Sequence, residues 1–252
     1  MKVKSISAII LTTLFLQNSI ANENCTVIKN KSSEKVKISQ CNDTQNHIRI
    51  LSKLNTNQIH KLHISHSNLH NIRWSEVSVP QSTIQYTNIH DALIKKSNMS
   101  NINLNHTVFL NSNFYKTNLS NANINQSNIQ KSHLKNSNLD KSNLNYAKLN
   151  MNKFHNINFL NAKINHSNLD NSQFINVDFY NSTINNSDLS FANLYNSNLD
   201  GVILHKTHIN HSNIKNSSFN NSNIHHSSFN GGIIEKSSFK NSHIHHSSFN
   251  KS

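Results

Sequence analysis

Six histidines towards the C-terminal end of the sequence recur at intervals that suit metal binding. They are separated by 2 or 20 residues, or are immediate neighbours, and comprise His205, His225, His226, His243, His245 and His246. Side chains two apart on a β-strand project to the same side, and neighbouring strands lie about 4.8 Å apart. If the fold stacks residues 20 apart, three or four imidazoles can approach one divalent ion of the zinc, nickel or copper type. The alternative is a solvated row in which His takes the place of Asn.

Lysines are concentrated at positions that a 20-residue coil would place on one side of the fold. Seven of the 14 Lys in residues 81–252 fall there, and outward Tyr residues accompany them. The candidate binding residues are Lys95, Lys96, Tyr115, Lys116, Lys135, Lys153, Tyr195 and Lys215. Basic groups interleaved with aromatic rings suit a polyanion or a glycan surface. The alternative is a solvated face whose charge only maintains solubility.

The sequence shows no arrangement typical of a catalytic centre. Its acidic residues are scattered, and Asp140 and Asp200 are three 20-residue steps apart. At the strand spacing this separates them by about 14 Å, too far for a glycosidase pair. Glycine occurs only at 201, 231 and 232, in no nucleotide-binding pattern. We therefore expect neither enzymatic activity nor a cofactor.

A five-residue repeat must position these groups. Every fifth residue from Leu54 to Phe249 is apolar, which gives 40 positions in a chain that is only 35% apolar. Two residues before each of them the side chain is usually small, and Asn usually lies between the two. A period of five fits neither a helix at 3.6 nor a flat strand at 2, so the chain must turn at every unit. A square coil with one unit per side places the apolar and the small residue inside.

The units read Ser-Asn-Leu at 137–139, 142–144, 167–169 and 197–199. This pattern resembles the pentapeptide-repeat family, whose unit is A-(D/N)-L-x-x, with Ser in place of the equally small Ala. The resemblance covers about residues 65–250 and implies an all-β fold, a right-handed quadrilateral parallel β-helix. Four units per coil would stack residues 20 apart, pairing Phe154 with Phe174. They would also align Asn105, Asn125, Asn145, Asn165 and Asn185 into an amide ladder.

The N-terminus indicates export. Residues 1–21 combine a basic start, an apolar stretch from Ile6 to Leu16 and small residues at Ser19 and Ala21, the pattern of a secretory signal peptide. We expect a periplasmic or extracellular protein. No apolar run reaches the roughly 20 residues of a transmembrane span.

The stretch 22–64 fits the repeat poorly and is interpreted as an N-terminal cap that precedes a solenoid at 65–252. In an oxidising compartment Cys25 and Cys41 would form a single disulfide; the alternative is two free thiols. At the other end, the apolar residues up to Phe249 would form an exposed strand edge, an association hazard. We expect a second copy to stack there as a homodimer.

These features favour a non-enzymatic exported repeat protein that binds a macromolecule, an anionic polymer or another protein, through a flat side of the solenoid. The family includes acidic DNA mimics that inhibit topoisomerases, and a formal net charge of +13 argues against that role. One alternative is a secreted effector that acts in another cell. Another is an ice- or surface-water-binding solenoid, although the outward positions mix Lys, His, Asn and Tyr.

Overall fold

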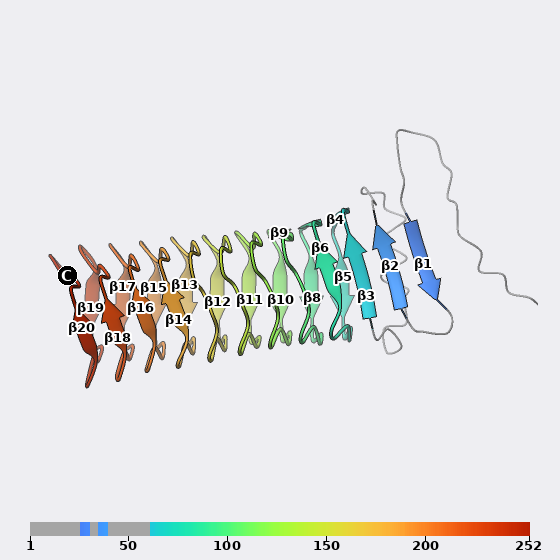
Figure 1. Cartoon of the computed structure of the whole chain (residues 1–252). Coiled ribbons are helices and arrows are strands. Elements are labelled where there is room, and N and C mark those ends of the chain that lie inside the picture. Colours follow the sequence, from blue (N-terminus) through green and yellow to red (C-terminus); the bar gives the residue numbers. More distant parts are fainter. Residues whose placement is uncertain (1–25, 31–34, 40–60) are drawn as a thin grey trace, which may run out of the picture.

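The structure, a computed structural model, describes residues 26–30, 35–39 and 61–252. The regular elements in these residues are β-strands and isolated β-bridges. They stack as coils along a straight rod (Figure 1). The signal peptide predicted at 1–21, both cysteines of the predicted disulfide and much of the predicted cap at 22–64 lie outside the described residues.

One side of the rod is a nine-stranded sheet in the order β19-β17-β15-β13-β12-β11-β10-β8-β5. Its strands are β5 (Arg73–Ser75), β8 (Leu93–Lys95), β10 (Asn113–Tyr115), β11 (His133–Lys135), β12 (Lys153–His155), β13 (Gln173–Ile175), β15 (Asn193–Tyr195), β17 (Asn213–Lys215) and β19 (Ile233–Glu235). We call this side the basic face.

The opposite side of the rod, half a coil away, carries the amide ladder, and we call it the amide face. Its strands are β3 (Lys61–Ser65), β6 (Thr83–Gln85), β14 (Thr183–Asn185), β16 (Ile203–His205), β18 (Asn223–His225) and β20 (His243–His245). Isolated parallel bridges from Thr83 to Thr183 join its two halves. Ahead of β3 lie β2 (Lys35–Ser39), parallel to it, and β1 (Thr26–Asn30), antiparallel to β2.

The other two sides are built mainly from isolated bridges. The third side begins with β4 (Asn68–His70), β7 (Asn88–His90) and β9 (Val108–Leu110) and continues as bridges to Ser248. The fourth side consists of bridges from Ser78 to Ser238. Each coil therefore has four sides of five residues, which confirms the predicted quadrilateral parallel β-helix.

The register stacks residues 20 apart, as predicted. Lys153, Phe154 and His155 of β12 pair with Gln173, Phe174 and Ile175 of β13. The Phe154 and Phe174 rings stack inside the rod with centroids 5.0 Å apart. A single continuous core of inward apolar side chains runs from Leu62 to Phe229.

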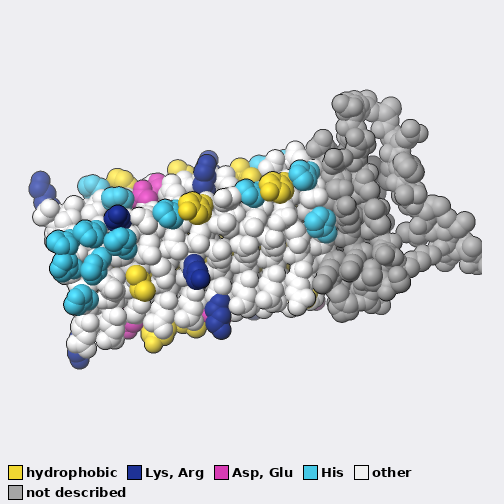
Figure 2. Space-filling model, viewed as in Figure 1, with side chains coloured by type: hydrophobic (Ala, Val, Ile, Leu, Met, Phe, Trp, Pro, Cys, Tyr) yellow, Lys and Arg dark blue, Asp and Glu magenta, His cyan; other side chains and the backbone are white. Residues whose placement is uncertain are grey.

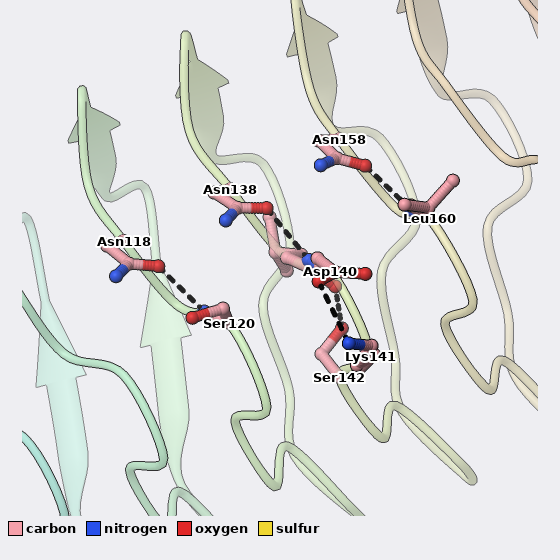
Figure 3. A network of polar contacts seen from close by, with 9 residues as sticks. Asn118, Ser120, Asn138, Asp140, Lys141, Ser142, Asn158 and Leu160 are labelled. Atoms are coloured by element: carbon pink, nitrogen blue, oxygen red, sulfur yellow. Dashed lines mark hydrogen bonds and ion pairs between the residues drawn. The ribbon is translucent and has the colours of Figure 1, made fainter.

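The corners account for part of the high Asn content, since 15 of the residues with a positive φ are Asn. Every fifth residue from His66 to Lys251 has a positive φ, including Gly201 and Gly231. This left-handed conformation costs an L-residue roughly 1–2 kcal/mol, and the short polar side chain of Asn tolerates it better than most. Asn side chains elsewhere in the unit accept hydrogen bonds from the backbone two residues later. On the fourth side Asn118 Oδ1 accepts the Ser120 N–H at 3.1 Å, and Asn158 Oδ1 accepts the Leu160 N–H at 2.8 Å (Figure 3).

Most of the buried serines are hydrogen-bonded between coils. The Ser167 backbone N–H donates to Ser187 Oγ at 3.1 Å, and Ser187 Oγ–H donates to the Ile164 carbonyl at 2.8 Å. Asn152 occupies one of the small inward positions and makes the same two kinds of hydrogen bond. Its Oδ1 accepts the Ser132 N–H at 2.8 Å, and its Nδ2 donates to the Ile129 carbonyl at 2.5 Å. At these positions the small inward residue is a polar group whose hydrogen bonds are satisfied, which is the condition for burying it. Ser182 is an exception, because its Oγ is buried and has no hydrogen-bond partner among the described residues.

The part of the chain that the structure describes contains no helix long and apolar enough to cross a membrane.

Candidate functional site

The basic face brings the predicted lysines into one array. Tyr115 on β10 pairs with Lys95 on β8 and with Lys135 on β11, so their side chains lie in one outward column. Lys116 lies at the adjoining corner, with its Nζ 5.4 Å from the centroid of the Tyr115 ring. At that distance the cation and the ring attract each other. The structure therefore assembles cations around an aromatic side chain, as the sequence predicted.

Two of the predicted lysines have acidic partners. Lys96 Nζ lies 3.0 Å from Glu76 Oε1, and Lys215 Nζ lies 3.0 Å from Glu235 Oε2. Within the described residues no such ion pair involves Lys95, Lys116, Lys135 or Lys153. These four exposed lysines, on β8 to β12 and at the corner after β10, form a group whose charge is free to meet a ligand.

Two histidines on this face were missed from the sequence. His133 pairs in register with Lys153, and His155 pairs with Lys135. Both extend the columns of the four free lysines, and their 20-residue spacing from those lysines could have revealed them. Tyr195 lies further along the column of Tyr115 and is separated from Lys135 by His155 and Ile175.

The six predicted histidines gather at the C-terminal end of the amide face, where Figure 2 shows a cluster of His side chains. The centroid of the His225 ring on β18 lies 5.4 Å from His245 and 6.2 Å from His243, both on β20. The corner residues His226 and His246 stack at 4.9 Å, and the His205 ring meets His226 edge-on at 5.6 Å. The structure thus brings all six together.

The pKa values of two of the six, His226 and His245, are lowered by desolvation and by the charges of their neighbours. The charge of His246, then desolvation, then the charges of His225 and His243 lower the pKa of His245 below its ordinary 6.5. Desolvation, followed by the charges of His246, His205, Lys206 and His245, lowers the pKa of His226. In the described residues no three His, Cys, Asp or Glu side chains are arranged around one point as metal ligands. The metal site stays a prediction.

A ridge of rings along one corner also escaped the sequence reasoning. Tyr86 stacks between His66 and His106, with centroids 5.1 and 4.8 Å away, and Tyr146 stacks on His166 at 4.8 Å. Part of this ridge is the row of His and hydrophobic side chains that runs along the rod in Figure 2. Each ring faces the next one, so mainly ring edges are turned to solvent. The signal in the sequence was again the 20-residue spacing.

The C-terminal end of the rod has edge strands. β19 and β20 are the last strands of their sheets. Ile234, Phe239 and Phe249 pack against the core but are only partly buried, and Ile244 is 41% exposed. The predicted association at this end stays a prediction.

A comparison with protein families identifies the repeat. A family model described as pentapeptide repeats matches residues 87–126, 117–150, 153–190 and 187–225, together more than half of the chain. A comparison with curated proteins found no match.

Among solved structures, the chain is similar to HetL, a pentapeptide-repeat protein involved in heterocyst differentiation regulation from the cyanobacterium Nostoc sp. strain PCC 7120. The identity is 14%, the match covers 69% of this chain and 87% of HetL, and the TM-score is 0.37. It is also similar to QnrB1, a plasmid-mediated fluoroquinolone resistance protein, with 17% identity, 73% and 86% coverage and a TM-score of 0.42.

Proposed function

The chain belongs to the pentapeptide-repeat family, and we propose that it is a non-enzymatic binding scaffold whose basic face holds an anionic polymer. The rod presents flat outward columns of side chains at the regular spacing of its strands, which suits a long ligand with repeated charges. Its acidic residues are dispersed along the sequence, which supports a binding role over catalysis.

The observation that carries this proposal is the array of free cations around Tyr115. Lys95, Lys116, Lys135 and Lys153 are exposed and lie on successive coils about 4.8 Å apart. A linear anionic polysaccharide lying along the rod would meet one or more of these ammonium groups at each step. The ring of Tyr115 offers such a ligand an apolar contact between the charges.

Export is part of the proposal. It is supported by the signal-peptide pattern at 1–21, and it would place the rod among envelope or extracellular polymers. Mass spectrometry of the protein isolated from its native cells should show an N-terminus that begins after Ala21. A chain that retains Met1 and Lys2 would contradict export by this route.

Changing Lys95, Lys116, Lys135 and Lys153 together to Gln should weaken binding to heparin, used as a model anionic polysaccharide. We expect a loss of roughly tenfold or more at low salt, since exposed ion pairs contribute about 0.2–1 kcal/mol each. Binding of the unmodified protein should also weaken with added salt, which screens exposed charges over about 8–10 Å. Affinity chromatography and fluorescence titration measure both effects.

The matched control changes Lys148, Lys163, Lys206 and Lys240 to Gln. These lysines are exposed, have no ion-pair partner in the described residues and lie off the basic face, so the same total charge is removed. The control variant should keep most of the affinity. Equal losses in the two variants would show that net charge alone attracts the polymer.

The proposal extends to a homodimer through the C-terminal end. Changing Phe249 to Lys places a charge on the partly buried apolar rim and should shift the protein from dimer to monomer in sedimentation experiments. Asn250→Lys adds the same charge at an exposed neighbour and should leave the dimer intact. An unmodified protein that sediments as a monomer at high concentration would contradict this association.

A further inference from the structure

The last two strands of the amide face place three imidazoles on a common surface. His243 and His245 are two residues apart on β20, so their side chains project to the same side. His225 on β18 pairs in register with His245. The side chains of His243 and His245 are exposed and that of His225 is half-exposed.

One of the ring separations is close to that of imidazoles that share one ion, and a second is about 1 Å longer. A Zn²⁺–N bond of about 2.0–2.1 Å places the centroids of two imidazoles on one tetrahedral ion about 5 Å apart. The His225 centroid lies 5.4 Å from that of His245 and 6.2 Å from that of His243. The rings now lie nearly parallel, at interplanar angles of 22° and 17°, so their nitrogens do not yet converge. Exposed side chains change rotamer within nanoseconds, so convergence needs only rotation of the rings.

The outward column that contains His205, His225 and His245 holds Asn in the preceding coils, where its side-chain hydrogen bonds differ. At one step of the column Asn165 Nδ2–H donates to Asn145 Oδ1 at 3.0 Å, whereas in the described residues Asn105 Oδ1 and Asn125 Oδ1 have no hydrogen-bond partner. From His205 onward imidazoles replace these amides, and within the described residues no ring nitrogen of His225, His243 or His245 has a hydrogen-bond partner. The three imidazoles leave their nitrogens available.

We propose that His225, His243 and His245 bind one transition-metal ion of the Zn²⁺, Ni²⁺ or Cu²⁺ type on the outer surface of β18 and β20. Imidazole nitrogen suits these metals, and three protein ligands with an open position form a recognised coordination set. His246 is the nearest candidate for a fourth ligand, since its ring centroid lies 4.0 Å from that of His245. The site is on a different side of the rod from the basic face, so it is independent of polymer binding.

The test is titration of the full, untagged chain with ZnCl₂ by calorimetry, accompanied by thermal melting. We expect one ion per chain and a melting temperature that rises with the concentration of Zn²⁺, because a ligand that binds only the folded state stabilises it. Changing His225 and His245 to Asn should weaken the binding at least tenfold and remove the shift in melting temperature. Asn occupies earlier positions of this column, so the variant should fold.

The matched control changes His70 and His90 to Asn. These two rings also stack, with centroids 4.9 Å apart on β4 and β7, but belong to no such group of three. The control should bind Zn²⁺ like the unmodified protein. Absence of stoichiometric binding, or equal losses in the two double variants, would overturn the proposal.

Discussion

Replacing Leu144 with Asp is expected to lower and broaden the unfolding transition of the rod, or to remove it. The Leu144 side chain is completely buried and lies between the Ile124 and Ile164 layers of the core. No Lys or Arg is among the buried residues of the described rod, and burying a carboxylate there unpaired costs roughly several kcal/mol even after protonation and local relaxation. Circular dichroism during heating should show a lower, broader transition or β-structure already lost at room temperature.

The loss should spread because each coil is stabilised by its neighbours. In a solenoid, stability is approximately a sum over repeats and the interfaces between them, so one broken coil also weakens the two that contact it. Asn145→Asp is the matched control: Asn145 Oδ1 accepts the Asn165 N–H at 3.0 Å, and a carboxylate oxygen can accept it as well. A melting curve of Leu144→Asp identical to that of Asn145→Asp would contradict the inward assignment of this residue.

Replacing Asn152 with Leu should destabilise the protein by about 2–5 kcal/mol. Leu cannot accept the Ser132 N–H or donate to the Ile129 carbonyl, and each buried group left without a partner costs about 1–3 kcal/mol. The larger apolar side chain does not offset this loss, because both backbone groups remain buried between coils. Urea unfolding monitored by circular dichroism would measure the change in the free energy of unfolding.

Asn152→Ser tests whether the hydrogen bonds, and not only the volume, matter at this position. Ser occupies the same column one coil earlier and one coil later, at Ser132 and Ser172, so its hydroxyl should restore at least one of the two bonds. We expect Asn152→Ser to retain most of the stability that Asn152→Leu loses. If Leu were the better tolerated of the two, the inter-coil hydrogen bonds would contribute little.

The fold was largely predictable because a single period determines which side chains face inward. An apolar residue at every fifth position requires a coil of five-residue sides, and the likeness of residues 20 apart predicts the register, as the Phe154–Phe174 stack confirms. The bonding of the buried serines was not predictable in the same way. Size alone made Ser acceptable in place of Ala, whereas the bond from Ser187 Oγ to the Ile164 carbonyl depends on the three-dimensional distance between coils.

The candidate surfaces were predicted less completely. Column membership follows from the repeat, so Lys95, Tyr115 and Lys135 were correctly placed together. Whether a lysine is free or paired with an acid depends on its neighbours and on side-chain rotamers. The ion pair between Lys96 and Glu76 therefore leaves fewer free cations on the face than the number of lysines suggests. Glu76 precedes residues 81–252, over which the lysines were counted, although its 20-residue distance from Lys96 marks it as a neighbour.

The left-handed corner at every fifth residue makes each five-residue unit geometrically interchangeable with the next. Loss of one unit, for example residues 121–125, would therefore preserve the inward pattern while turning everything downstream by a quarter of a revolution. Lys95 and Tyr115 would then stay on their original side, while Lys135 would move to an adjacent side. Loss of four units would shorten the rod and leave every column aligned. An insertion or deletion that preserves the surface columns must therefore be a multiple of 20 residues. One that preserves only the buried core can be any multiple of five.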